Sequence, residues 1–184
     1  MKEDIREYAK IGLAHQLLYS RAIEKRREHA QTLKLFVRRN NIETLDCYIP
    51  YGEEERRLSI EAVKSCGKEV VHALHLFPLR KISLASLSDP EQAQCRLIVE
   101  DQIQVAGAVG ATGFVFASGA DLMPGDRPQG RRAFANFCGW FCRKLKPHGI
   151  VALLEPFDRD IDKKFLYGPT SECIELIESL KPEI

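Results

Sequence analysis

The chain has 184 residues, of which 45% are hydrophobic, and this is enough for one domain with a full core. Its 27 basic and 26 acidic residues leave a net charge of +1, which disfavours a general basic surface for nucleic acid. No apolar run approaches the roughly 20 residues that span a bilayer. The charged first seven residues do not resemble a secretion signal, so we expect a cytoplasmic protein.

Six cysteines occur, mostly within apolar periodic segments. In a chain without a secretion signal we expect them to be reduced residues of the core. Cys138 and Cys142 are four residues apart, which is a helical spacing, and no second pair completes a zinc site. A packing face of a helix is therefore the expected role of this pair.

Five segments have the pattern of strands, and a helix is expected after each of them. In chain order the expected strands are residues 10–18, 43–49, 69–77, 112–117 and 150–154. The expected helices are residues 22–39, 53–65, 89–109, 131–145 and 171–180. Gly67 and Gly110 follow two of these helices, at the position where glycine commonly ends a helix. Strands that alternate with helices over short turns predict a parallel sheet with helices outside it.

The length of the repeat distinguishes an open doubly wound sheet from a (β/α) barrel. Five βα units occupy 184 residues, so eight units at this pitch would take roughly 290 residues, a usual length for such barrels. No Gly-x-Gly-x-x-Gly pattern follows the first strand, and no Walker-type lysine loop is present, which disfavours the nucleotide-binding open sheets. The sequence therefore predicts one α/β domain over residues 1–184, of the TIM-barrel type and with five of eight units.

The segment around Glu155 carries the strongest functional signal. Residues 150–154 are wholly apolar, which is typical of a strand buried on both faces. Glu155 ends this strand, and Pro156 removes the next backbone donor. Because α/β proteins place their chemistry at the C-terminal ends of parallel strands, Glu155 is the first candidate for a catalytic residue. A dense mixed-charge loop, residues 158–164, precedes the last helix.

Three segments resemble the xylose isomerase-like barrels, and in particular their sugar phosphate isomerase/epimerase branch. Residues 155–164 with 168–170 resemble the fifth-strand motif of that branch. Residues 106–114 with 118–119 resemble its third helix and fourth strand, and residues 84–91 resemble the loop before that helix. The resemblance covers the whole chain. It implies the N-terminal part of a barrel that binds one divalent metal through carboxylates and a histidine from strands five to eight.

The resemblance implies that Glu155 is both the first metal ligand and a catalytic group. In related isomerases the matching glutamate binds the metal and helps to move a proton next to the sugar carbonyl. That step needs a base in reach and a cation that stabilises the enediolate. Mn²⁺, Mg²⁺, Co²⁺ and Zn²⁺ are the expected metals. The other ligands would lie beyond Ile184, so we expect weak or absent metal binding and no turnover by the isolated chain.

Five other residues are candidate contacts to a sugar or sugar phosphate. His15, His75 and Ser118 come at or near the ends of the first, third and fourth expected strands. Arg159 and Lys163 carry charges that grip a phosphate or sugar acid, although a salt-bridged surface loop explains them equally well.

The remaining histidines have simpler expected roles. His72 is expected to pack inside the barrel. His29 and His148, on a helix and in a turn, are expected to be solvated.

Two other classes of function remain open. A metal-dependent endonuclease of the same superfamily needs a zinc-binding histidine at the end of the fourth strand, where this chain has Ser118, and a hydroxyl is a poor zinc ligand. A truncated, non-catalytic chain would instead need a partner to complete the barrel. Strands at both open edges expose apolar side chains and backbone groups, so we expect a homo-oligomer or recruitment of the missing part of the barrel.

Overall fold

The chain folds into strands and helices in the order that the sequence predicts. The computed structural model describes residues 5–21, 28–50, 52–74 and 83–181. Its strands are β1 (Gly12–Ala14), β2 (Thr44–Cys47), β3 (Glu69–Ala73), β4 (Gly113–Phe116) and β5 (Val151–Leu154). Its helices are α1 (His15–Leu18), α3 (His29–Val37), α4 (Glu53–Lys64), α6 (Asp89–Ala108), α7 (Arg127–Leu145) and α8 (Thr170–Leu180), with short 3-10 turns η1 (Ile5–Glu7) and η3 (Lys146–His148).

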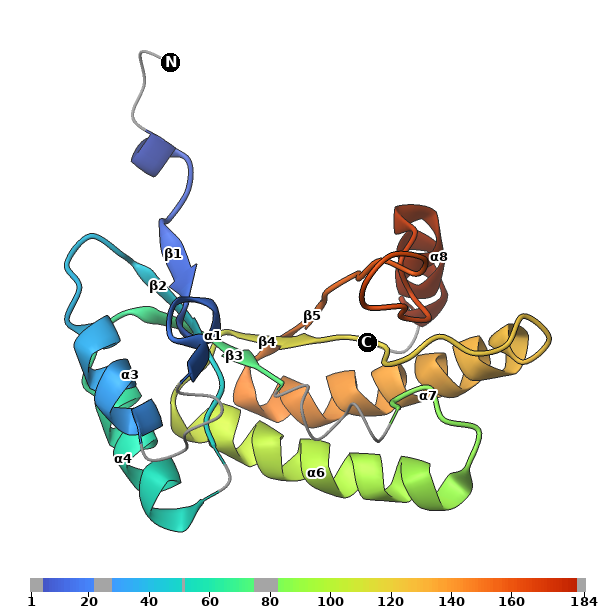
Figure 1. Cartoon of the computed structure of the whole chain (residues 1–184), viewed down its shortest axis with the longest axis horizontal. Helices are drawn as coiled ribbons and strands as arrows, with labels where there is room; N and C mark the ends of the chain where they lie inside the picture. Colours follow the sequence, from blue (N-terminus) through green and yellow to red (C-terminus); the bar gives the residue numbers. More distant parts are fainter. Residues whose placement is uncertain (1–4, 22–27, 51, 75–82, 182–184) are drawn as a thin grey trace. The chain divides into compact units, whose positions relative to one another are not determined.

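The strands form one five-stranded sheet in the order β1-β2-β3-β4-β5 (Figure 1). The pairs β1–β2 and β2–β3 are parallel. Sequential parallel strands joined by helices are the topology of a (β/α) barrel, whereas a doubly wound sheet places its first strand in the middle. The predicted α/β sheet of the barrel type, with five strands in place of eight, is therefore confirmed for the described residues.

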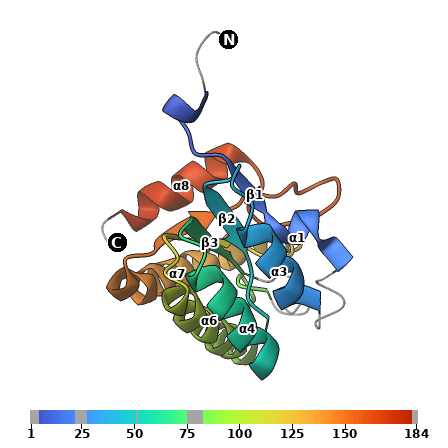
Figure 2. The ribbon, with the colours of Figure 1, turned by 90° about the vertical axis from the view of Figure 1, so that its left-hand side faces the viewer.

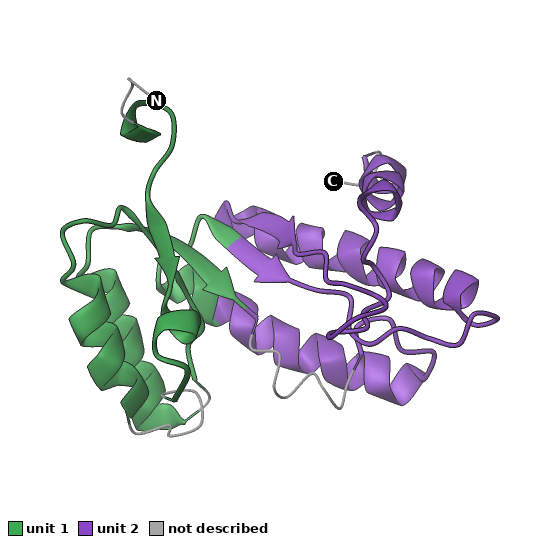
Figure 3. Cartoon of the chain, turned by 45° about the horizontal axis from the view of Figure 1, so that its top comes forward, with its two compact units in different colours: residues 1–73, 105–113 green, residues 74–104, 114–184 purple. Residues whose placement is uncertain are grey.

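Two compact units divide the chain (Figure 3). Unit 1 consists of residues 1–73 and 105–113, and unit 2 of residues 74–104 and 114–184. Each unit has its own buried side chains and is described by itself. The expectation of a single domain over residues 1–184 stays a prediction.

The strands of unit 1 have one buried and one partly open face. Leu13 pairs with Leu45, and Leu45 pairs with Val70. Leu45 and Val70 are 0% and 3% exposed. Thr44 and Asp46 flank Leu45 and are only half buried, because successive residues of a strand point to opposite faces. Alternation along β2 therefore assigns one face of these strands to the core.

The helices α3 and α4 lie side by side in unit 1 (Figure 2). Ala30, Leu33 and Phe36 are buried, and their spacing places them on one face of α3. The Ala30 N–H donates a hydrogen bond to the Glu55 carboxylate of α4, which satisfies one backbone donor at the start of α3. Gly67 follows α4 with a φ of +65°, as its predicted place at a helix end requires.

Aromatic side chains form the core of unit 2. Phe114 and Phe116 lie on the same face of β4, and their ring centres are 5.0 and 4.8 Å from that of Phe141 on α7. Phe134 and Phe137 extend the cluster along α7. All five rings are at most 4% exposed, so this cluster supplies much of the apolar burial that stabilises unit 2.

The helices α6 and α7 run beside each other along unit 2 (Figure 1). The Arg96 guanidinium lies 5.4 Å from the centre of the Trp140 ring, and Lys144 forms an ion pair with Glu100. α7 begins four residues before the predicted start at residue 131, because Pro128 fits a first helical turn. Among the described residues, no helix combines the length and apolar character that a membrane span requires.

The last strand, β5, corrects one prediction. The apolar run of residues 150–154 predicts burial on both faces, but Val151 is 61% and Leu153 39% exposed. β5 stands at the end of the strand order, so it pairs with β4 alone. The apolar run therefore reflects a strand suited to burial whose alternate side chains stay uncovered in the described chain.

The cysteines are free thiols, as predicted. Four of them are buried, and Cys66 and Cys142 are half buried. Burial raises the pKa of the Cys138 thiol well above its usual value, which keeps this thiol protonated and unreactive. Cys138 and Cys142 thus take the expected packing role on α7.

Candidate active site at the end of strand β5

Glu155 directly follows β5 and has its backbone fixed by the sheet. Its N–H donates a 2.8 Å hydrogen bond to the Phe116 carbonyl of β4, which extends the pairing of the two strands by one residue. The residue itself is exposed. A carboxylate on a fixed backbone at the C-terminal end of a strand is the arrangement from which α/β barrels build active sites.

Ser118 lies two residues after β4 and is used inside the fold. Its side chain is 1% exposed. The Oγ atom accepts a 3.1 Å hydrogen bond from the Tyr167 N–H, and it lies 3.2 Å from the Gly119 carbonyl, to which it donates. The Gly119 carbonyl also accepts a hydrogen bond from the Leu166 N–H. Ser118 therefore ties the end of β4 to the segment that precedes α8.

The charged loop after Glu155 is organised by Asp158. Its carboxylate accepts hydrogen bonds from three successive backbone N–H groups, those of Ile161, Asp162 and Lys163. These bonds, that from Lys163 first, lower the pKa of Asp158 below its usual value. The loop is thus held in a defined conformation by an anionic side chain that faces its own backbone.

Arg159 is committed to an ion-pair cluster. Its guanidinium binds the Glu172 carboxylate of α8 through two nitrogens and also donates to the Leu166 carbonyl. Arg131 of α7 donates to the same carboxylate at 2.5 Å. The hydrogen bond from Arg159 is the main reason that the pKa of Glu172 is lowered. Arg159 therefore joins the charged loop to two helices, and only 12% of its side chain is exposed.

Lys163 is the more accessible of the two predicted anion contacts. Its side chain is 42% exposed, and its ammonium pairs with Asp162 at 2.6 Å. Sequence reasoning did not find Glu172, the centre of the ion-pair cluster. Its place in the first turn of α8 was visible, but its partner Arg159 depends on the fold of the loop.

His15 and His29 meet in the interior of unit 1. His15 follows β1, and both side chains are 0% exposed. The prediction that His29 is solvated is wrong: α3 places this ring over Tyr48, and its Nε2 lies 3.0 Å from the Tyr48 carbonyl. A substrate would reach His15 only if unit 1 opened.

The remaining histidines divide into buried, exposed and undescribed. His72 on β3 is buried, as predicted. His148 is exposed in the turn before β5, also as predicted. His75 lies outside the described residues.

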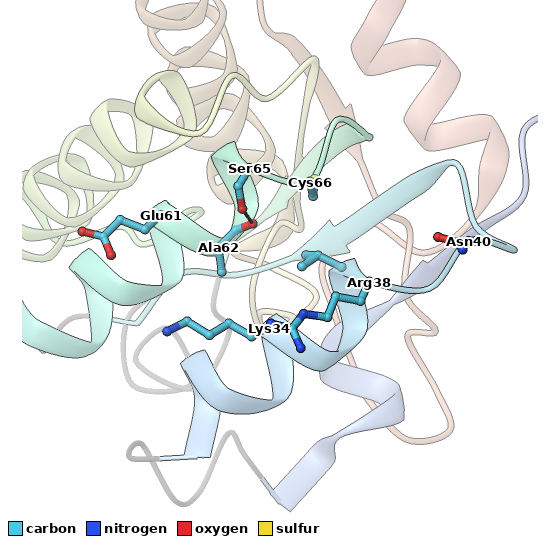
Figure 4. A pocket seen from close by; sticks show the side chains of 8 residues that line it. Lys34, Arg38, Asn40, Glu61, Ala62, Ser65 and Cys66 are labelled. Carbon is cyan, nitrogen blue, oxygen red and sulfur yellow. Dashed lines mark hydrogen bonds between the residues drawn. The ribbon is translucent and has the colours of Figure 1, made fainter.

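A groove in unit 1 is formed by the last turns of α3 and α4 and the residues that follow them (Figure 4). Its volume is about 620 Å³. In a βα unit these turns face the N-terminal ends of the strands, the side that barrels use for stability. Lys34 sits in the last turn of α3, where a cation complements the helix dipole. The residues that line the groove are Lys34, Val37, Arg38, Asn40, Glu61, Ala62, Ser65 and Cys66.

The metal ligands available in the described chain are incomplete. No group of three or more His, Cys, Asp or Glu side chains in the described ranges is arranged to hold a metal ion. Glu155 supplies one carboxylate, whereas Mg²⁺ and its relatives take about six oxygen ligands. The described residues therefore do not fit a complete metal centre.

Solved structures establish the fold to which this arrangement belongs. No protein-family model matches the sequence, and no curated protein is similar to it. The chain has the fold of xylose isomerase-like barrels. It superposes on an AP endonuclease of family 2 from Brucella melitensis with a TM-score of 0.66 and 18% identity, covering 84% of this chain and 60% of that one.

Two further solved structures have sugar-related names. An L-ribulose 3-epimerase matches with a TM-score of 0.63 and 13% identity, over 94% of this chain and 57% of that one. A xylose isomerase domain protein from Planctomyces limnophilus matches with a TM-score of 0.56 and 14% identity, over 83% and 54%. The chain thus spans little more than half the length of the barrels it resembles.

Proposed function

We propose that this chain forms part of a metal-dependent sugar isomerase or epimerase, with Glu155 as its catalytic carboxylate. The observation that supports the proposal is the exposed Glu155 side chain on a backbone fixed by the Phe116 carbonyl at the end of β5. The fold shared with an L-ribulose 3-epimerase is consistent with this chemistry. The shared fold does not by itself separate this class from the endonucleases.

Glu155 would take or return the proton on the carbon next to the sugar carbonyl. An exposed carboxylate reaches a substrate without disturbing the core, and its backbone hydrogen bond limits where the side chain can go. A divalent metal would stabilise the enediolate oxygen in the complete barrel. Because the described residues supply one carboxylate toward such a metal, the remaining ligands must come from further βα units.

The contacts to substrate follow from accessibility. Lys163 is the candidate for a phosphate or acid group, because its ammonium is partly exposed and its loop is ordered by Asp158. Arg159 contributes less directly, through the Glu172 pair that fixes the same loop. Ser118 acts by joining β4 to the Tyr167 backbone.

The proposed partner is the remaining part of a barrel, three further βα units. In unit 2, Val151 and Leu153 of β5 and Ile174 and Ile177 of α8 are 39% to 61% exposed. In unit 1, Leu13 on β1 is 41% exposed. Apolar side chains on terminal strands of a parallel sheet are what an added βα unit covers. A second copy of the chain in the same place is the competing occupant.

Deuterium exchange tests the proposed reaction even when the identity of the sugar is open. The protein expressed from its complete reading frame is incubated in D₂O with Mn²⁺ and a panel of ketoses and their phosphates, and exchange next to the carbonyl is followed by NMR. Exchange that falls at least a thousandfold in Glu155→Gln and persists in the loop control Asp162→Asn supports the proposal. Exchange that survives Glu155→Gln contradicts it, as does cleavage of abasic DNA with no exchange on any sugar.

A further inference from the structure

Two histidines in unit 1 form a buried pair that the proposed reaction does not use. The ring centres of His15 and His29 are 4.8 Å apart, and the rings are inclined by 78°. Tyr19, Phe36 and Tyr48 surround them at ring separations of 4.5 to 5.6 Å. Two imidazoles with no exposed surface inside an aromatic shell need an explanation, because burial of polar groups is costly.

The hydrogen bonds fix the tautomer of each ring. The Tyr48 carbonyl can only accept, so Nε2 of His29 carries the proton and donates to it. The single hydroxyl proton of Thr32 goes to a carbonyl, that of Glu28 at 2.9 Å or that of His29 at 3.0 Å. Thr32 Oγ1 therefore accepts from Nε2 of His15 at 3.1 Å. In both rings Nδ1 is left with an unprotonated lone pair.

These lone pairs have no partner in the described structure. The Nδ1 atoms of His15 and His29 are buried and lack a hydrogen bond, and so is the amide oxygen of Gln16. The other end of the Gln16 amide donates to Asp46 at 3.2 Å, which fixes which atom of the amide is the acceptor. Three buried acceptors on neighbouring residues thus have no donor, and a missing ion or water is the usual reason.

We propose that His15 and His29 bind a divalent transition-metal ion, such as Zn²⁺, through their Nδ1 atoms. A metal-binding histidine typically donates its other ring N–H to a carbonyl or similar acceptor, and both rings do this here. A Zn–N bond of about 2.1 Å and a tetrahedral angle place the two ring centres about 5 Å apart. The observed 4.8 Å agrees with this separation.

The charge state of the pair suits a metal. Burial is the main cause that lowers the pKa of His15 to about 3 and that of His29 to about 4, so both rings are neutral near pH 7. A neutral imidazole is the ligand form, and no proton has to be displaced. Two imidazoles are fewer than the three protein ligands of most catalytic zinc sites, so the Gln16 oxygen and water would take the remaining positions. The site is independent of Glu155.

Cobalt titration of the metal-free chain tests the site, because Co²⁺ replaces Zn²⁺ and absorbs visible light when bound by nitrogen ligands. We expect one equivalent to bind, with affinity at least tenfold weaker in His15→Phe and His29→Gln. Phenylalanine preserves the aromatic packing, and glutamine preserves a donor to the Tyr48 carbonyl. The controls His148→Gln and Glu155→Gln should leave this binding within twofold of wild type, which separates the site from the proposed reaction.

A second measurement needs no variant. The ¹⁵N chemical shifts of both histidines are recorded in the wild-type chain before and after Zn²⁺ is added, and the Nδ1 signals of His15 and His29 should move while that of His148 does not. The proposal is overturned if these Nδ1 signals stay in place at millimolar Zn²⁺, or if the two variants bind Co²⁺ as tightly as wild type. Water alone would then satisfy the acceptors.

Discussion

The ion-pair cluster around Glu172 allows a quantitative test of how unit 2 is held together. Replacing Glu172 by glutamine keeps the size of the side chain but removes the charge that Arg159 and Arg131 share. Breaking a fully buried pair costs about 3 to 5 kcal/mol, whereas an exposed pair contributes about 0 to 1 kcal/mol. The side chains of Glu172 and Arg159 are 17% and 12% exposed, so we expect a loss near the middle of these values, about 2 kcal/mol.

Urea unfolding followed by Trp140 fluorescence measures this loss, because Trp140 lies on α7 in the same unit. With a urea dependence of about 2 to 3 kcal/mol/M, the midpoint should fall by about 0.7 to 1 M. Glu178→Gln on the same helix is the matched control: Glu178 pairs with Lys181 at the surface, with 58% and 62% of the side chains exposed. A fall for Glu172→Gln no larger than that of the control would refute the expected strength of the cluster.

The pH dependence adds a sign to the same test. The pKa of Glu172 is lowered in the folded chain, chiefly by the Arg159 hydrogen bond. The stabilisation is therefore fully present above the usual glutamate pKa of about 4.3 and is lost as the pH falls below it. The difference between wild type and Glu172→Gln should shrink on acidification. A difference that stays constant down to about pH 3, well below that usual pKa, would show that packing, and not charge, is responsible.

Three further perturbations have distinct expected results. Phe141→Ala should lower the free energy of unfolding by about 3 to 5 kcal/mol in a urea titration, because the ring is fully buried, whereas Leu97→Ala, 70% exposed, should have little effect. Gly119→Ala should cost about 1 to 3 kcal/mol in the same titration, since this residue has a φ of +90°. The chain should sediment as more than a monomer, and charged substitution of Val151 and Leu153 should reduce that association; a concentration-independent monomer of the wild type would contradict it.

The order of strands and helices could be predicted because it depends on local patterns. Apolar runs end at Gly and Pro residues, and Gly67 takes the positive φ that its position after a helix requires. The burial of β5 could not be predicted in the same way. Residues 150–154 show only that a strand is suited to burial, while the exposure of Val151 depends on whether a further segment covers it.

The candidate site was predictable in position but not in its contacts. Glu155 follows from the end of an apolar run, which the sequence displays directly. The tie from Arg159 to Glu172 joins residues 13 positions apart through a folded loop, so no local pattern reports it. His29 is a different case: it lies four residues before Leu33 and seven before Phe36, both buried on α3, so helical spacing contained the signal.

The hydrogen bonds of Ser118 have a consequence for how this protein can change over evolutionary time. The Glu155 N–H is held by Phe116, and the Tyr167 N–H is held by Ser118, so the charged loop enters and leaves at points fixed on one short segment. A loop closed at its base can be lengthened, shortened or recharged while its ends stay in place. Descendants of this chain can therefore vary residues 160–164 to suit new ligands while the carboxylate of Glu155 keeps its position.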